Sequence, residues 1–144
     1  MISVEEIKAE DTYPIRKELL RKNMDLSSQF TGDFDKESFH LGLFYENKLV
    51  SIVSFMKTNH KMLNGEQYQL RGMATIEKFQ GKGFGKILVE KSEEILINKN
   101  INYVWCNARV IALNFYKNIG FIIMGEPFEI PPIGKHFSMS KKLI

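Results

Sequence analysis

The heptapeptide Gln80–Lys86 is the feature of the sequence that most restricts its fold. It reads Gln-Gly-Lys-Gly-Phe-Gly-Lys, so glycine occupies three alternate positions. The residues before it, 67–76, have the pattern of a β-strand, and the apolar residues after it recur at helical spacing as far as Asn98. The segment therefore predicts a sharp strand-to-helix connection. Its glycines expose backbone N–H groups and remove side chains that would keep a ligand away.

A helix that begins at this connection suits a phosphate or pyrophosphate, because its first N–H groups are unpaired and its dipole is positive there. Lys78, Lys82 and Lys86 add positive charge. The spacing differs from the dinucleotide fingerprint, whose final glycine is replaced by Lys86. A Walker A loop is excluded because Gln80 replaces its first glycine and Ile87 follows the lysine. The glycines alone leave a plain structural turn as an equal alternative.

The whole chain, residues 1–144, predicts one mixed α/β domain without repeats or linkers. Asp11 is expected to cap a helix with Pro14 in its first turn, and Gly120 to end another. Loops are expected at 24–37 and 126–136. Strands are expected near 2–7, 39–45, 49–56, 67–76, 101–106, 121–124 and 136–143, and helices near 11–20, 84–98 and 111–118.

Charge and composition exclude several classes of function. The net charge is +3 and no segment carries a basic stripe, which argues against nucleic acid as the partner. The single cysteine, Cys106, excludes an intramolecular disulfide. No signal peptide is recognised, and no apolar run approaches the ~18 residues that span a membrane. We therefore expect a cytoplasmic protein without a membrane partner. No metal is expected, since no His, Cys and carboxylate set has zinc spacing.

Several motifs together resemble one family. Gln80-x-x-Gly83-x-Gly85 is similar to the Arg/Gln-x-x-Gly-x-Gly/Ala signature of the GNAT superfamily of N-acetyltransferases, whose loop binds the CoA pyrophosphate. The segments 70–75 and 112–121 resemble that family's splayed strand and its second CoA-contacting helix. The resemblance covers 68–144 through motifs and 1–67 through element order. It implies a GNAT-like α+β fold with a central, mostly antiparallel, splayed sheet flanked by helices, and acetyl-CoA as co-substrate.

The resemblance also implies which residues contact acetyl-CoA. Backbone N–H groups of 73–75 are expected to bond the acetyl carbonyl and the pantetheine arm, and Asn114 the pantetheine chain. Gln80 stands where many members carry arginine, which removes one cation from the phosphate site. The implied contacts are Met73, Ala74, Thr75, Gln80, Gly81, Lys82, Gly83, Phe84, Gly85, Lys86, Asn107 and Asn114.

Acyl transfer to an amine needs a base, because an alkyl ammonium has a pKa of about 10, and it benefits from an acid for the thiolate. Tyr116 occupies the family's tyrosine position and is the candidate acid; its alternative is packing in the core. His136 is the candidate base by its place at the start of the last strand; its alternative is to cap the preceding turn. Glu126 and Glu129 are further candidates for the base.

The sequence thus predicts direct transfer of an acetyl group from acetyl-CoA to a primary amine of a small molecule or peptide. A non-catalytic acetyl-CoA sensor that regulates a partner is the alternative. Arg71 and Arg109 are expected either to attract an acidic acceptor or to pair with carboxylates such as Glu66 or Glu126. The acceptor and the oligomeric state stay open, with a homodimer among the alternatives.

Overall fold

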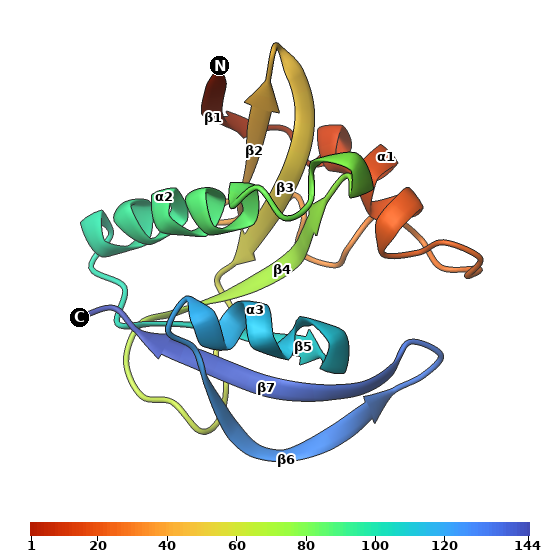
Figure 1. Cartoon of the computed structure of the whole chain (residues 1–144). Helices are drawn as coiled ribbons and strands as arrows, with labels where there is room; N and C mark the ends of the chain where they lie inside the picture. Colours follow the sequence, from red (N-terminus) through yellow and green to blue (C-terminus); the bar gives the residue numbers. More distant parts are fainter. The chain divides into compact units, whose positions relative to one another are not determined.

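The computed structural model describes all residues from Met1 to Ile144 and contains one seven-stranded sheet flanked by three helices (Figure 1). The strand order is β1-β2-β3-β4-β5-β7-β6. The strands are β1 (Ile2–Ile7), β2 (Phe39–Tyr45), β3 (Lys48–Met56), β4 (Gln67–Thr75), β5 (Tyr103–Arg109), β6 (Ile122–Ile130) and β7 (Gly134–Lys142). The helices are α1 (Ala9–Leu19), α2 (Phe84–Asn98) and α3 (Leu113–Asn118), with 3-10 turns at Glu77–Phe79 and Val110–Ala112.

The pairing confirms the predicted mixed, mostly antiparallel sheet. β1 with β2, β2 with β3, β5 with β7, and β6 with β7 are antiparallel, whereas β4 and β5 are parallel. The parallel ladder comprises three residue pairs, Gln67–Gln69 with Tyr103–Trp105. Both strands continue beyond it, to Thr75 and Arg109. A ladder this short is what a splayed pair of strands requires.

The chain forms two compact units, which are described separately below. The N-terminal unit comprises Met1–Lys57 and Leu70–Ile95, and the C-terminal unit comprises Thr58–Gln69 and Leu96–Ile144. The prediction that residues 1–144 act as a single domain stays a prediction. None of the helices combines the length and the hydropathy required to cross a bilayer.

In the N-terminal unit, a two-residue turn joins β2 to β3, and a small core holds α1 against the sheet. Glu46 and Asn47 both have positive φ, 49° and 65°, which is the backbone of a type I′ hairpin turn. Ile15 of α1 packs with Ile52 of β3 and Ala74 of β4, all buried. The end of β4, where ligand contacts are predicted, therefore rests on the same core as α1.

The start of α1 differs from the prediction. The helix begins at Ala9 rather than near Asp11, and Pro14 is its sixth residue rather than a first-turn residue. The reason is that Asp11 caps from inside the first turn: its Oδ2 accepts a hydrogen bond from the Lys8 amide at 3.0 Å. The helix thus begins two residues earlier than predicted.

In the C-terminal unit, the strands are longer than predicted. β5 extends to Arg109, so Asn107 lies within the strand instead of following it. β6 extends to Ile130 through Pro127, which we had expected in a loop at 126–136. The proline is tolerated because the register with β7 shifts between Met124 and Phe128, and a bulge does not need its missing N–H.

Candidate active site

The loop before α2 has an open backbone in the N-terminal unit. Gly81 and Gly83 have φ values of 78° and 81°, a region that L side chains rarely adopt. A Cβ added at either position would meet no atom within 4 Å. The Ile87 amide donates to the Gly83 carbonyl at 3.1 Å, which makes Gly83 the residue at the helix start. The loop therefore presents backbone to open space.

The predicted loop contacts divide into exposed groups and one buried ring. Lys82 and Lys86 are exposed, and α2 has no acidic residue in its first turn. Phe84 is buried, with its ring centroid 5.9 Å from that of Tyr45 and 6.3 Å from that of Phe79. The Phe84 side chain thus belongs to the core, and only the backbone of Phe84 is a candidate for ligand contact. Gly85, the second residue of α2, is half-buried.

Gln80 connects this loop to the end of β4. Its Nε2 donates to the Thr75 carbonyl at 2.9 Å. Sequence reasoning considered Gln80 only as a missing cation, and nothing in the sequence indicated this bond. The amide fixes the distance between the loop and the strand that supplies the predicted carbonyl donors.

The end of β4 is shaped by one glycine and one serine. Gly72 has φ 63°, so the backbone turns just before Met73, and a Cβ there would lie 2.9 Å from the Phe30 ring. The Ser51 hydroxyl lies 2.8 Å from Thr75 Oγ1. Ala74 is buried, whereas Met73 and Thr75 are half-buried. The three residues predicted to bond the acetyl group are therefore held by contacts on both sides.

Behind this strand lies a buried ion pair that sequence reasoning missed. The Arg16 guanidinium of α1 bonds both carboxylate oxygens of Asp33, at 2.8 Å and 3.0 Å. Burial alone would raise the pKa of Asp33, but hydrogen bonds from Arg16 and the Phe30 amide, with the charges of Arg16 and His40, outweigh it and hold that pKa below its usual range. Arg16 also donates to Ser54 Oγ at 2.9 Å, and Ser54 Oγ lies 2.6 Å from His40 Nδ1.

In the C-terminal unit, the candidate acid is buried in an aromatic cluster. The Tyr116 ring lies 5.1 Å from the Phe115 ring and 5.3 Å from the Phe121 ring, centroid to centroid. Burial, and secondarily the Cys106 thiol, raises the pKa of Tyr116 well above its usual value. The phenol is therefore protonated at neutral pH, as a proton donor must be. Asn114, two residues earlier, is exposed.

Asn107 is oriented by a chain of side-chain hydrogen bonds. The Met62 amide donates to His60 Nδ1 at 3.1 Å, so the His60 proton is on Nε2, which lies 3.3 Å from Ser138 Oγ. Ser138 Oγ in turn donates to Asn107 Oδ1 at 2.8 Å. Burial, and then Lys61, lowers the pKa of His60, which keeps this tautomer neutral. The chain leaves the Asn107 NH₂ group as the donor for a ligand.

The candidate base, His136, makes the contact expected of a turn cap. It is buried, and its Nδ1 lies 2.7 Å from the Gly134 carbonyl oxygen. Because the carbonyl can only accept, Nδ1 carries the proton and Nε2 has the lone pair. The alternatives Glu126 and Glu129 are exposed on β6, where the expected loop is absent.

The predicted residues divide between the two units, and only the loop and the end of β4 are joined by a contact, that of Gln80 with Thr75. Loop residues 80–86 and strand residues 73–75 form the first group, and the second comprises Asn107, Asn114, Tyr116 and His136. Cys106 is buried, and burial raises the pKa of its thiol far above the usual range, so it is not a nucleophile. No three His, Cys, Asp or Glu side chains are placed to hold a metal ion.

Comparisons with known proteins identify relatives of this chain. Residues 2–121 match the model of the acetyltransferase (GNAT) family. The "Uncharacterized N-acetyltransferase YitI" of Bacillus subtilis (strain 168) is 39% identical over 145 residues, which cover 99% of this chain and 97% of that protein. Two solved structures share the fold at low identity. Escherichia coli ElaA has a TM-score of 0.80 at 18% identity, covering 98% of this chain and 99% of that one. An aminoglycoside 6'-N-acetyltransferase complexed with coenzyme A has a TM-score of 0.78 at 11% identity, covering 99% and 97%.

Proposed function

Since the chain belongs to the acetyltransferase (GNAT) family, and is thus an acetyl-CoA-dependent acyltransferase, we propose that it acetylates a primary amine of a small molecule or peptide by direct attack on the thioester. The observation that carries the proposal is the open backbone of the 80–86 loop. Gly81 and Gly83 leave clear space at the start of the 15-residue helix α2, which has no acidic residue in its first turn. The CoA pyrophosphate occupies that space, with Lys82 and Lys86 beside it.

The thioester carbonyl takes its hydrogen bonds from the backbone N–H groups of Met73 to Thr75. Donors that are fixed before the reaction stabilise the oxyanion without reorganising. Three features support this role: the positive φ of Gly72, the hydrogen bond between Ser51 and Thr75, and the hydrogen bond from Gln80 to the Thr75 carbonyl. Asn114, which is exposed, bonds the pantetheine chain, and Asn107, held by Ser138, is a further contact of acetyl-CoA.

Tyr116 donates a proton to the departing thiolate. A phenol with a raised pKa is a weak acid, but burial also raises the pKa of the neighbouring Cys106 thiol. A thiolate released into such apolar surroundings is correspondingly more basic, so it needs a proton from a neighbouring donor such as Tyr116. His136 accepts a proton from the acceptor's ammonium group at Nε2, since Nδ1 is committed to the Gly134 carbonyl, and the neutral amine then attacks the thioester.

The pyrophosphate assignment is tested by replacing Gly83 with valine. Positive φ costs about 1–2 kcal/mol for an L residue, so the fold should survive, while the side chain projects into the space assigned to the phosphates. We expect calorimetry to detect no acetyl-CoA binding. Gly125→Val is the matched control, because Gly125 has a similar φ of 71° and an added Cβ would meet no atom closer than 3.5 Å. Unchanged affinity in a folded Gly83→Val protein would contradict the assignment.

Turnover is tested separately from binding. Acetyl-CoA consumption is followed across amino acids, polyamines, antibiotics and peptide N-termini, with mass detection of the acetylated product. Formation of an N-acetylated product supports the enzyme. Tight acetyl-CoA binding without turnover of any amine favours the non-catalytic sensor instead.

A further inference from the structure

Three arginine side chains surround one phenylalanine ring in the N-terminal unit. The guanidinium carbons of Arg16, Arg71 and Arg21 lie 3.7, 4.6 and 4.9 Å from the centroid of the Phe30 ring. Phe30 itself is buried. Cations favour the face of an aromatic ring, yet three of them together repel each other. In the free protein, this repulsion between the three guanidinium groups is reduced only where a carboxylate lies close to them.

The carboxylate of this cluster, Asp33, is already committed. It bonds Arg16 with both oxygens, and its Oδ2 also accepts the Phe30 amide at 2.8 Å. Arg16 is fully buried and uses four of its N–H groups on Asp33, Ser28 and Ser54. Arg16 and Asp33 therefore form a structural pair that has no group left for a ligand except the buried, unpartnered Arg16 Nε.

Arg71 has no such partner. It forms no ion pair, and its one hydrogen bond is a long one, 3.4 Å from Nη1 to the Thr31 carbonyl. Burial, and then the charge of Arg16, lowers the pKa of Arg71, while Asp33 raises it only in part. Arg71 is half-buried, and no ion pair compensates its positive charge. Of the two expectations from the sequence, pairing with a carboxylate of this chain is wrong for Arg71.

We propose that Arg71 binds a carboxylate group of the acceptor, so that the acceptor is a small amine that also carries a carboxylate, such as an amino acid. This inference rests on the proposed function. A guanidinium presents two parallel N–H groups, which match the two oxygens of a carboxylate. Polyamines are disfavoured, because the positive charge of Arg71, which no carboxylate of this chain pairs, repels them.

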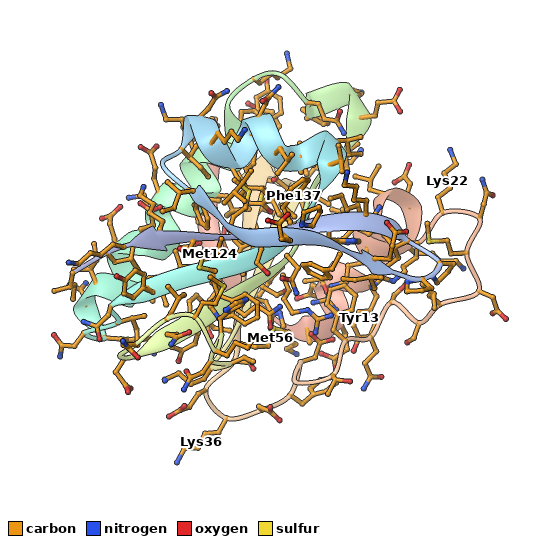
Figure 2. All side chains as sticks on the ribbon, turned by 90° about the horizontal axis from the view of Figure 1, so that it is seen from below. Tyr13, Lys22, Lys36, Met56, Met124 and Phe137 are labelled. Carbon is orange, nitrogen blue, oxygen red and sulfur yellow. The ribbon has the colours of Figure 1, made fainter.

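The position of Arg71 agrees with this role. It precedes Met73 by two residues on β4. Because strand residues rise about 3.3 Å each, the proposed carboxylate site at Arg71 lies close to the proposed carbonyl donors. A pocket of about 880 Å³ borders the cluster through Arg21, whereas Arg71 itself is not among its lining residues. Figure 2 shows the Lys22 side chain, which also lines this pocket, projecting outward, whereas Tyr13 points inward.

The test compares matched amines with and without the carboxylate. Free amino acids and ω-amino acids are paired with their carboxamides, and kcat/KM is measured for each member at saturating acetyl-CoA. We expect wild type to prefer the carboxylate member by about 10- to 100-fold, as one charged hydrogen-bonded contact allows. Arg71→Gln should raise KM for the carboxylate members by a similar factor and leave the carboxamides unchanged. Lys48→Gln is the control, because Lys48 also lies near a phenylalanine ring but is exposed.

The failure of this inference differs from the failure of the proposed function. Calorimetry of acetyl-CoA binding is run on every variant. If wild type binds and turns over acetyl-CoA but shows no preference for carboxylates, the inference is overturned while the proposed function stands. An equal loss for both members in Arg71→Gln also overturns it. If that variant does not fold, competitive inhibition of wild type by glutarate against its diamide decides: equal inhibition overturns the inference.

Discussion

Replacing Asp33 by asparagine removes one charge from an ion pair whose two side chains are both fully buried. In the wild type, Asp33 gives Arg16 two hydrogen bonds, of 2.8 and 3.0 Å. Asparagine keeps one acceptor oxygen but places an NH₂ group opposite the second guanidinium nitrogen. The guanidinium cannot lose its proton, so it stays charged and buried beside Arg71.

The expected loss follows from that geometry. Removing one partner of a buried pair costs about 3–5 kcal/mol, because the remaining charge is uncompensated. One retained bond to the asparagine oxygen, and the bonds of Arg16 to Ser28 and Ser54, place Asp33→Asn near the lower end, at about 3 kcal/mol. A domain of this size has a free energy of unfolding of about 5–15 kcal/mol, so the change is large.

Urea unfolding followed by circular dichroism measures the difference at constant slope m. The pH dependence adds a second check on the same carboxylate. Because the folded-state pKa of Asp33 is lowered, its stabilisation is present above the unfolded pKa of about 3.9 and is lost as the pH falls through the folded value. The difference between wild type and Asp33→Asn should therefore be constant from pH 7 to about 5 and shrink below about 4.

Two results would refute this reasoning. A loss below about 1 kcal/mol would mean that the pair is no stronger than an exposed one. A difference that persists unchanged at the lowest pH where the protein is folded would mean that the charge of Asp33 is not its source. A double-mutant cycle with Arg16→Met separates the pair from its surroundings, and coupling of about 2 kcal/mol is expected.

Two further predictions concern turnover. Tyr116→Phe should lower kcat by about 100-fold or more while changing the KM for acetyl-CoA little, because the proton is donated only as the C–S bond breaks; equal kcat in both proteins, with chemistry rate-limiting, removes Tyr116 from the mechanism. His136→Ala should lose most activity together with the acidic limb of the pH profile of kcat/KM. If the folded variant keeps that limb, His136 is a turn cap, and the base is Glu126, Glu129 or a water molecule.

The sequence predicted the elements whose signals are local. The helix at 84–98 was predicted at its observed bounds, because glycines precede it and its apolar residues keep helical spacing throughout. The hairpin at Glu46 and Asn47 likewise follows from two adjacent residues. The short prediction for β6 failed because Pro127 is a stop signal by itself, and only pairing with β7 shows that it lies at a bulge.

The contacts that shape the candidate site are mostly not local. Arg16 lies in α1 at a position that sequence reasoning left unremarked, since its partner Asp33 is 17 residues away in a loop. His60 had no predicted role, because Ser138, which links it to Asn107, is 78 residues away. A single sequence does not show which distant residues pair. The glycines of the 80–86 loop, by contrast, indicate an unusual backbone conformation from their identity alone.

The burial of Cys106 makes this chain a reporter of its own unfolding. It is the single thiol in the sequence, it is almost fully buried, and its pKa is far too high for a thiolate to form in place. A thiol reagent can modify it only when β5 opens, so the rate of modification measures the population of open molecules in plain buffer. A ligand that binds only the closed form slows that rate in proportion to its occupancy. Candidate acceptors can thus be ranked by the protection of one sulfur atom, before any product has been identified.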